Sequence, residues 1–221
     1  MPVWQRRADS SVSGRDCTAC DRTVRVTGKF APLIGALIGT LGGIIYWLAA
    51  QLWPASVAVI LSMAATVLLT TEISSAVPAT RLDSFGRVLC LLIKYNALMA
   101  LSAAKLPFPA PANIPLALIM ICGYAASFAL LVGVSATRPE KSAPRVGSAS
   151  LGLALLIGFA PAALLGIPGL IGLAAAIIAG IGIIAFLKYT RTGASGNMLD
   201  MTQLITEACF YLGALATWKY V

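Results

Sequence analysis

Long apolar runs dominate this chain of 221 residues. Several of them have about the 20 residues that an α-helix needs to cross the hydrocarbon core of a bilayer, and 59% of all residues are hydrophobic while only 11% are charged. The runs are continuously apolar instead of alternating, which excludes a transmembrane β-barrel. We therefore expect an all-α, polytopic integral membrane protein, a helical bundle of seven transmembrane helices with six as the alternative. The expected spans are 32–52, 55–76, 87–104, 114–135, 149–167, 169–187 and 202–219.

Two places leave the span count open. The third run contains Lys94 and Asn96, and the fifth and sixth runs are separated only by Ile167, Pro168 and Gly169. A Pro-Gly pair between two apolar runs favours a tight turn over one bent helix. We therefore predict that the fifth and sixth runs are separate helices.

Basic residues mark one side of the membrane. Thirteen of them precede the first run or lie in every second loop, whereas the opposite loops and the C-terminus carry only Lys105 and Lys219. Because short basic loops are retained in the cytoplasm, we expect a cytoplasmic N-terminus and an exported C-terminus in a bacterial inner (plasma) membrane. Topology and anionic lipid explain the net charge of +8, which argues against nucleic-acid binding. The thirteen residues are Arg6, Arg7, Arg15, Arg22, Arg25, Lys29, Arg81, Arg87, Arg138, Lys141, Arg145, Lys188 and Arg191.

The N-terminal segment before the first apolar run is polar and contains Cys17 and Cys20 in a CxxC spacing. Structural zinc normally requires four ligands, but the chain has no histidine and its three other cysteines lie in apolar runs. We therefore expect residues 1–29 to form a flexible cytoplasmic tail and residues 30–221 to form a single transmembrane domain. A redox pair, or a metal site shared between two copies, is the alternative role of the cysteines.

A polar signature stands between the last two apolar runs, in the sequence RTGASGNMLDMTQLITE (191–207). It resembles a run near the C-terminus of cobalamin synthases, which reads glycine, an aromatic residue, Thr-Gly-Asp, Leu-Gly-Ala, Gln and a closing glutamate. Asn197 stands where the family has the aspartate, and Asp200 stands where it usually has glycine. The residues in register with the family are Ser195, Gly196, Leu199, Gln203 and Glu207.

Two further stretches are similar to the same family, in the same order along the chain. FAPLIGALIGTLGG (30–43) matches the start of a glycine-rich helix, although small residues at four-residue spacing also serve helix packing in any membrane protein. ATRLDSFGRVLCLLIKYNALMALSA (79–103) matches an arginine, a Ser-Phe-Gly element and an internal lysine, with Asp83 in place of a glycine. On three collinear matches the chain is identified as a divergent member of the cobalamin synthase (adenosylcobinamide-GDP ribazoletransferase) family. The matching residues are Pro32, Leu33, Gly35, Arg81, Ser84, Phe85, Gly86 and Lys94.

The resemblance implies a phosphoryl transfer. In the family reaction the hydroxyl of α-ribazole, or of its 5′-phosphate, attacks adenosylcobinamide-GDP and GMP leaves, among the last steps of adenosylcobalamin biosynthesis. Such a transfer requires neutralisation of phosphate charge, usually by Mg²⁺ on carboxylates and by an Arg or Lys side chain, and a base for the hydroxyl. The implied partners are adenosylcobinamide-GDP, α-ribazole and the lipid bilayer, with Mg²⁺ as cofactor. Whether the chain forms a homo-oligomer stays open.

The expected topology gathers two polar segments on the cytoplasmic face, one before the third run and one before the last. From the resemblance we expect Asp83, Asp200 and Glu207 to be catalytic, with Asp83 and Asp200 as metal ligands. The ordinary alternatives are a topological anchor for Arg81 and helix caps for the two aspartates. The expected substrate-binding residues are Arg81, Ser84, Ser195, Gly196 and Asn197.

Two charged residues lie inside apolar runs. Glu207 is one to two turns into the last run, where an ionisable group is costly unless it is paired or faces a wet cavity. Lys94 is two turns into the third run and either reaches the cytoplasmic surface or pairs with Glu72 or Glu207 inside the bundle. Of the two, we predict pairing.

One element of the family is missing. Cobalamin synthases carry an acidic element, His-Leu-Asp-Gly-Leu-Ala-Asp, that resembles the metal-binding aspartates of CDP-alcohol phosphotransferases, whereas residues 70–83 offer only Glu72 and Asp83. This favours, as the alternative, a catalytically degenerate relative that binds a corrinoid or acts as a scaffold. A transporter is a third class, but no repeat relates the two halves of the chain and the spans hold few polar residues.

Overall fold

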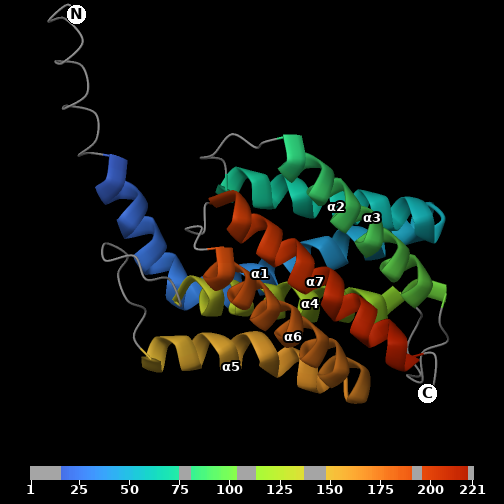
Figure 1. Cartoon of the computed structure of the whole chain (residues 1–221). Coiled ribbons are helices and arrows are strands. Elements are labelled where there is room, and N and C mark those ends of the chain that lie inside the picture. The colour runs from blue at the N-terminus through green and yellow to red at the C-terminus, as the bar shows by residue number, and fades with distance from the viewer. Residues whose placement is uncertain (1–15, 75–80, 104–112, 137–147, 191–195, 219–221) are drawn as a thin grey trace, which may run out of the picture.

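The fold is a bundle of helices in a computed structural model that describes residues 16–74, 81–103, 113–136, 148–190 and 196–218 (Figure 1). These residues form seven helices, and no strand occurs among them. The predicted all-α class and the predicted number of helices are therefore confirmed. The helices are α1 (Asp16–Leu52), α2 (Ala55–Ser74), α3 (Arg81–Ala103), α4 (Asn113–Ala136), α5 (Ser148–Leu164), α6 (Ile167–Thr190) and α7 (Gly196–Trp218).

The chain is an integral membrane protein, because four of these helices are long and apolar enough to cross a bilayer. Shorter apolar helices cover Ala55–Thr70 in α2 and Leu151–Leu164 in α5. The remaining helix, α7, carries Asp200 and Glu207 among its apolar residues. The four long apolar segments are Pro32–Leu52, Phe85–Ala103, Leu116–Val134 and Ile167–Tyr189.

Helix α1 is much longer than a bilayer requires. Its 37 residues span about 55 Å at the usual rise per residue, against a hydrocarbon core of about 30 Å. Figure 1 shows its first turns leading away from the other helices. The backbone of Cys17 and Cys20 belongs to these turns, so the expected boundary at residue 29 falls within a continuous helix. Residues 1–15 of the predicted flexible tail lie outside the described residues.

Helices α1 and α4 pack closely because glycine lines their contact. A Cβ atom on Gly39 would lie 2.8 Å from the Cα atom of Ile121, and one on Gly35 would lie 2.8 Å from the carbonyl oxygen of Tyr124. Both distances are too short for a side chain, so any residue larger than glycine would push the two backbones apart. The helix-packing role expected for these small residues is confirmed.

The chain turns sharply between α5 and α6. Gly166 has a φ of 68°, in the left-handed region that glycine enters without steric cost. Its N–H group donates to the carbonyl oxygen of Ala163 at 3.1 Å, which closes the end of α5. The predicted break between the fifth and sixth runs is confirmed, but Pro168 and Gly169 lie in the first turn of α6. Proline is tolerated there because the first N–H groups of a helix have no helical partner.

Helix α4 lies at the centre of the bundle, in contact with α1, α3, α5, α6 and α7. Helices α3 and α7 lie beside it and run in the same direction (Figure 1). The core around α4 is largely apolar, and the buried polar side chains belong to α2, α3, α4 and α7. The buried apolar residues of α4 are Leu116, Ile119, Met120, Cys122, Tyr124, Ala125, Ala126, Phe128, Ala129, Val132 and Val134.

Candidate functional site

Buried polar side chains gather on four of the seven helices. Among the residues whose side chains are described, all of them come from α2, α3, α4 and α7, and none from α1, α5 or α6. A membrane protein buries polar groups only where they find partners inside the bundle. The buried polar side chains of these four helices therefore form the candidate functional site. The residues are Ser62, Thr66, Lys94, Ser127, Thr202, Gln203, Thr206 and Glu207.

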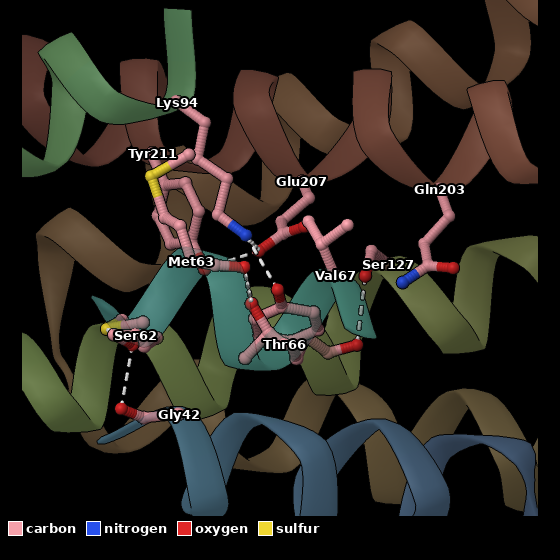
Figure 2. A network of polar contacts seen from close by, with 12 residues as sticks. Gly42, Ser62, Met63, Thr66, Val67, Lys94, Ser127, Gln203, Glu207 and Tyr211 are labelled. Atoms are coloured by element: carbon pink, nitrogen blue, oxygen red, sulfur yellow. Dashed lines mark hydrogen bonds and ion pairs between the residues drawn. The ribbon is translucent and has the colours of Figure 1, made fainter. Parts of the chain in front are cut away.

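An ion pair between Lys94 of α3 and Glu207 of α7 is the centre of this group (Figure 2). The Lys94 Nζ atom lies 2.7 Å from the Glu207 Oε1 atom, and the two side chains are 2% and 0% exposed. Lys94 also donates to the Tyr124 hydroxyl at 2.7 Å, and Tyr211 donates its hydroxyl proton to Glu207 Oε1 at 2.8 Å. The prediction that Lys94 pairs inside the bundle is confirmed, with Glu207 as its partner.

The pair is enclosed by aromatic rings. The Lys94 Nζ atom lies 4.4 Å from the ring centroid of Tyr124 and 5.9 Å from that of Tyr211, within the range of cation–π attraction. The other carboxylate oxygen, Glu207 Oε2, is buried and has no hydrogen-bond partner. One oxygen of Glu207 thus receives both donors, and the carboxylate as a whole is shielded from solvent.

The neighbouring hydroxyl groups are bonded to backbone carbonyls. Thr66 donates to Met63 at 3.0 Å, Ser127 to Tyr124 at 3.0 Å and Thr206 to Thr202 at 2.8 Å, each within its own helix. Such bonds satisfy a hydroxyl without a partner from another helix. Ser62 differs, because it donates across to the carbonyl oxygen of Gly42 in α1 at 2.7 Å. Each of these hydroxyls therefore has a backbone acceptor.

A second ion pair joins the same two helices nearer to their N-terminal ends. The Arg87 Nη2 atom of α3 lies 3.1 Å from the Asp200 Oδ2 atom of α7, and the two side chains are 28% and 31% exposed. The Arg87 Nε atom is buried and has no hydrogen-bond partner, so the contact uses one end of the guanidinium group. Asp200, predicted as a metal ligand, is engaged with a cation.

The remaining predicted site residues stand at the starts of α3 and α7. Arg81 is the first residue of α3, with Asp83 and Ser84 in its first turn, and Gly196 and Asn197 begin α7. Their side chains, like the whole of Ser195, lie outside the described part of the chain. Their roles in substrate binding, and that of Asp83 in catalysis, stay predictions.

The described carboxylates do not fit a magnesium ion. No group of three or more Asp, Glu, Cys or His side chains converges among the described residues. Asp200 and Glu207 each accept a cationic side chain, and Glu207 is fully buried. Mg²⁺ requires several oxygen ligands and usually keeps some of its water. No step of the reaction is therefore assigned to a metal on these two residues.

Three residues of the site were missed by the sequence reasoning. Tyr124 and Tyr211 looked like ordinary aromatic residues of apolar helices, and Arg87 was assigned only to membrane topology. The sequence did contain a sign of this pairing, because Arg87 and Lys94 are separated by the same number of residues as Asp200 and Glu207. That interval of seven residues returns to the same face of a helix after two turns.

The comparisons with known proteins point to the same family as the sequence resemblance. The family model described as cobalamin-5-phosphate synthase matches residues 15–73, which cover most of α1 and α2. An adenosylcobinamide-GDP ribazoletransferase of Leptothrix cholodnii is 29% identical over 87% of this chain and 86% of its own length. Another, of Ralstonia nicotianae, is 48% identical over 59 residues, which are 26% of this chain and 23% of that protein. No solved structure gives a significant match. The chain is thus similar to adenosylcobinamide-GDP ribazoletransferases along most of its length, and to the cobalamin-5-phosphate synthase family model in α1 and α2.

Proposed function

We propose that this membrane protein is an adenosylcobinamide-GDP ribazoletransferase, which joins α-ribazole or its 5′-phosphate to adenosylcobinamide-GDP and releases GMP. The observation that carries the proposal is the similarity to the Leptothrix cholodnii protein of that name along 87% of this chain and 86% of the relative. This match extends well beyond residues 15–73, to which the family model is limited.

The reacting groups are expected at the N-terminal ends of α3 and α7. Arg81 at the start of α3 supplies positive charge for the phosphates, and Asp83 in the same turn supplies a carboxylate. The first N–H groups of both helices add partial positive charge at the same end of the bundle. Mg²⁺ is the cofactor that the family resemblance implies, and its requirement is part of the test.

The proposed topology places this end of the bundle in the cytoplasm. Thirteen basic residues lie on the side of the N-terminus and only Lys105 and Lys219 on the opposite side, in a bacterial inner membrane. Reporter fusions to the two ends of the chain test the orientation. We expect a fluorescent protein that folds only in the cytoplasm to be bright at the N-terminus, and a periplasmic phosphatase to be active at the C-terminus.

The activity is tested with the purified full chain in lipid nanodiscs. Adenosylcobinamide-GDP and α-ribazole are supplied with Mg²⁺, and both GMP and the joined corrinoid are measured. We expect equal amounts of the two products, loss of turnover with a chelator, and loss of turnover in Asp83→Asn. The matched control is Asn96→Leu, on an exposed position of α3. Absence of turnover above Asp83→Asn would contradict the proposal.

A second function is favoured by one observation. Both described candidate carboxylates, Asp200 and Glu207, are engaged in ion pairs, as expected of a relative that kept the fold and lost the metal site. Such a protein would bind adenosylcobinamide-GDP without releasing GMP. Growth of a strain lacking its own cobalamin synthase, when supplied with this chain and with cobinamide, would exclude this second function.

A further inference from the structure

We propose that the pairs Arg87–Asp200 and Lys94–Glu207 form a two-rung ladder that fixes the axial register of α3 against α7. In this ladder Asp200 and Glu207 are positioning residues, not a metal ligand and a base. The register itself is independent of the activity, while its catalytic consequence rests on the function proposed above.

The spacing of the two pairs is the first argument. Arg87 and Lys94 are seven residues apart on α3, and Asp200 and Glu207 are seven residues apart on α7. Seven residues are about two helical turns, or about 10 Å along the axis. Because both numbers rise together, the helices are parallel, and a shift of either helix by one turn would separate both pairs at once. A single pair could follow such a shift by changing rotamer more easily than two pairs could.

The Lys94–Glu207 pair, the inner rung of the ladder, is hydrogen-bonded to a third helix. Lys94 bonds both Glu207 of α7 and the hydroxyl of Tyr124 in α4, each at 2.7 Å. Tyr211, one turn beyond Glu207 on α7, donates to the same carboxylate oxygen at 2.8 Å. Alternative registers would bury a charge without this set of partners, which is costly inside a membrane. A buried polar group that specifies one register is a well-attested use of such groups.

Beside the Arg87–Asp200 pair, the outer rung of the ladder, a side chain of α7 packs against a glycine of α3. Gly86 precedes Arg87, and Met201 follows Asp200. A Cβ atom on Gly86 would lie 2.8 Å from the Cε atom and 3.8 Å from the Sδ atom of Met201. The methionine side chain therefore occupies the space that glycine leaves, and in the observed register this contact lies next to the ion pair.

The ladder determines how the two predicted substrate-contact segments face each other. Arg81 begins α3 six residues before the outer rung, and Gly196 begins α7 four residues before it. The segments thus extend from the same end of a parallel pair of helices. Burial of Glu207 and the ion pair of Asp200 account for these carboxylates without contact to substrate.

The register is measured by cross-linking, independently of activity. In the full chain with its five native cysteines replaced by serine or alanine, the pair Gly86→Cys/Met201→Cys reports the observed register. The pair Gly86→Cys/Ile205→Cys, one turn further along α7, reports a shifted one. A short bifunctional thiol reagent is applied in nanodiscs. We expect the first pair to react at least about tenfold faster, since a buried polar contact specifies register strongly.

Removal of both buried charges then tests the ladder. In Lys94→Met/Glu207→Leu the chain keeps apolar residues of similar size, and we expect the ratio of the two cross-linking rates to fall by about fivefold or more. Asn96→Leu, on an exposed position of α3, is the matched control and should leave the ratio unchanged. An unchanged ratio in Lys94→Met/Glu207→Leu would overturn the proposal.

Charge reversal separates positioning from chemistry. Arg87→Asp should lower kcat for GMP release and the cross-linking ratio together, and Arg87→Asp/Asp200→Arg should restore most of both. A metal ligand or a base at position 200 could not be replaced by arginine, so a restored ratio without restored turnover would overturn the statement that Asp200 has no chemical role, and a ratio that stays low would overturn the outer pair as a determinant of register. If the unmodified chain shows no turnover, the proposed function fails, and the cross-linking ratios still decide whether the ladder exists.

Discussion

The two ion pairs between α3 and α7 share their chemistry and spacing but not their surroundings. In the outer pair the side chains of Arg87 and Asp200 are 28% and 31% exposed, and one guanidinium nitrogen contacts one carboxylate oxygen at 3.1 Å. In the inner pair Lys94 and Glu207 are 2% and 0% exposed and 2.7 Å apart, with tyrosine hydroxyls bonded to both. The same arrangement thus occurs once in a partly exposed position and once in a fully buried one.

This difference determines what each pair contributes. Exposed pairs add little stability because water and salt screen the attraction. A buried pair gains more attraction but loses hydration, so its presence is not itself strongly stabilising, whereas loss of one partner leaves an uncompensated charge. We infer that the inner pair makes one register the only acceptable one, and that the outer pair refines the same register where the helices reach the membrane surface.

The largest effect is expected when the inner pair is broken from one side. Lys94→Met leaves the buried Glu207 carboxylate without its cation, which should destabilise the protein by about 3–5 kcal/mol. The measurement is the fraction of protein that stays folded and monodisperse in mild detergent after a series of heating steps. Lys94→Met/Glu207→Leu removes both charges and should recover most of the loss. Equal stability of Lys94→Met and the unmodified protein would contradict the buried pair.

A smaller loss of stability is expected when Glu207 keeps its ion pair with Lys94 but loses its second hydrogen-bond donor. Tyr211→Phe removes the hydroxyl that bonds Glu207 Oε1 at 2.8 Å and preserves the ring, including its edge contact with Phe210. Hydrogen bonds to charged groups contribute about 1.5–3 kcal/mol, so the same heating assay should show an intermediate shift. Tyr189→Phe, at a tyrosine that is 89% exposed, is the control. Similar shifts in the two variants would show that the Tyr211 hydroxyl is not used.

Tyr124 should contribute less to stability than Tyr211, because both its hydroxyl and its ring contact Lys94. Tyr124→Phe removes the hydroxyl that accepts from Lys94 but leaves a ring whose centroid lies 4.4 Å from Nζ. With the cation–π attraction retained, a loss of about 1 kcal/mol is expected. A larger loss than that of Tyr211→Phe would mean that Lys94, and not Glu207, depends more on its tyrosine.

The sequence alone predicted that Lys94 is paired inside the bundle, but it did not predict the outer pair, for physical reasons. An ionisable residue inside an apolar helix must find a partner, so Glu72 and Glu207 were the two candidates for Lys94, and the structure selects Glu207. Arg87 and Asp200 lie near helix ends, where topology, capping or metal binding explain a charge equally well. Their pairing depends on α3 and α7 being neighbours, although the two residues are 113 positions apart.

The same distinction applies to the rest of the fold. Runs of apolar residues predicted the helices because hydrocarbon requires every backbone group to be bonded within the segment. The turn between α5 and α6 was predicted from Pro168, yet the reversal occurs at Gly166, whose positive φ depends on where the preceding helix ends. The roles of Tyr124 and Tyr211 required the packing of three helices, which no local pattern contains.

The smallest effect is expected at the outer pair, and it should differ in kind from the others. Arg87→Gln and Asp200→Asn, combined in a double-mutant cycle, should give a coupling energy of about 0.2–1 kcal/mol. This coupling should nearly vanish at about 1 M salt, where the Debye length is about 3 Å. The corresponding cycle at the inner pair, with Lys94→Met and Glu207→Leu, should not respond to salt, because no ions reach two side chains that are 2% and 0% exposed. If both coupling energies decreased with salt, water would reach Glu207. The distinction between a partly exposed outer pair and a buried inner pair would then be wrong.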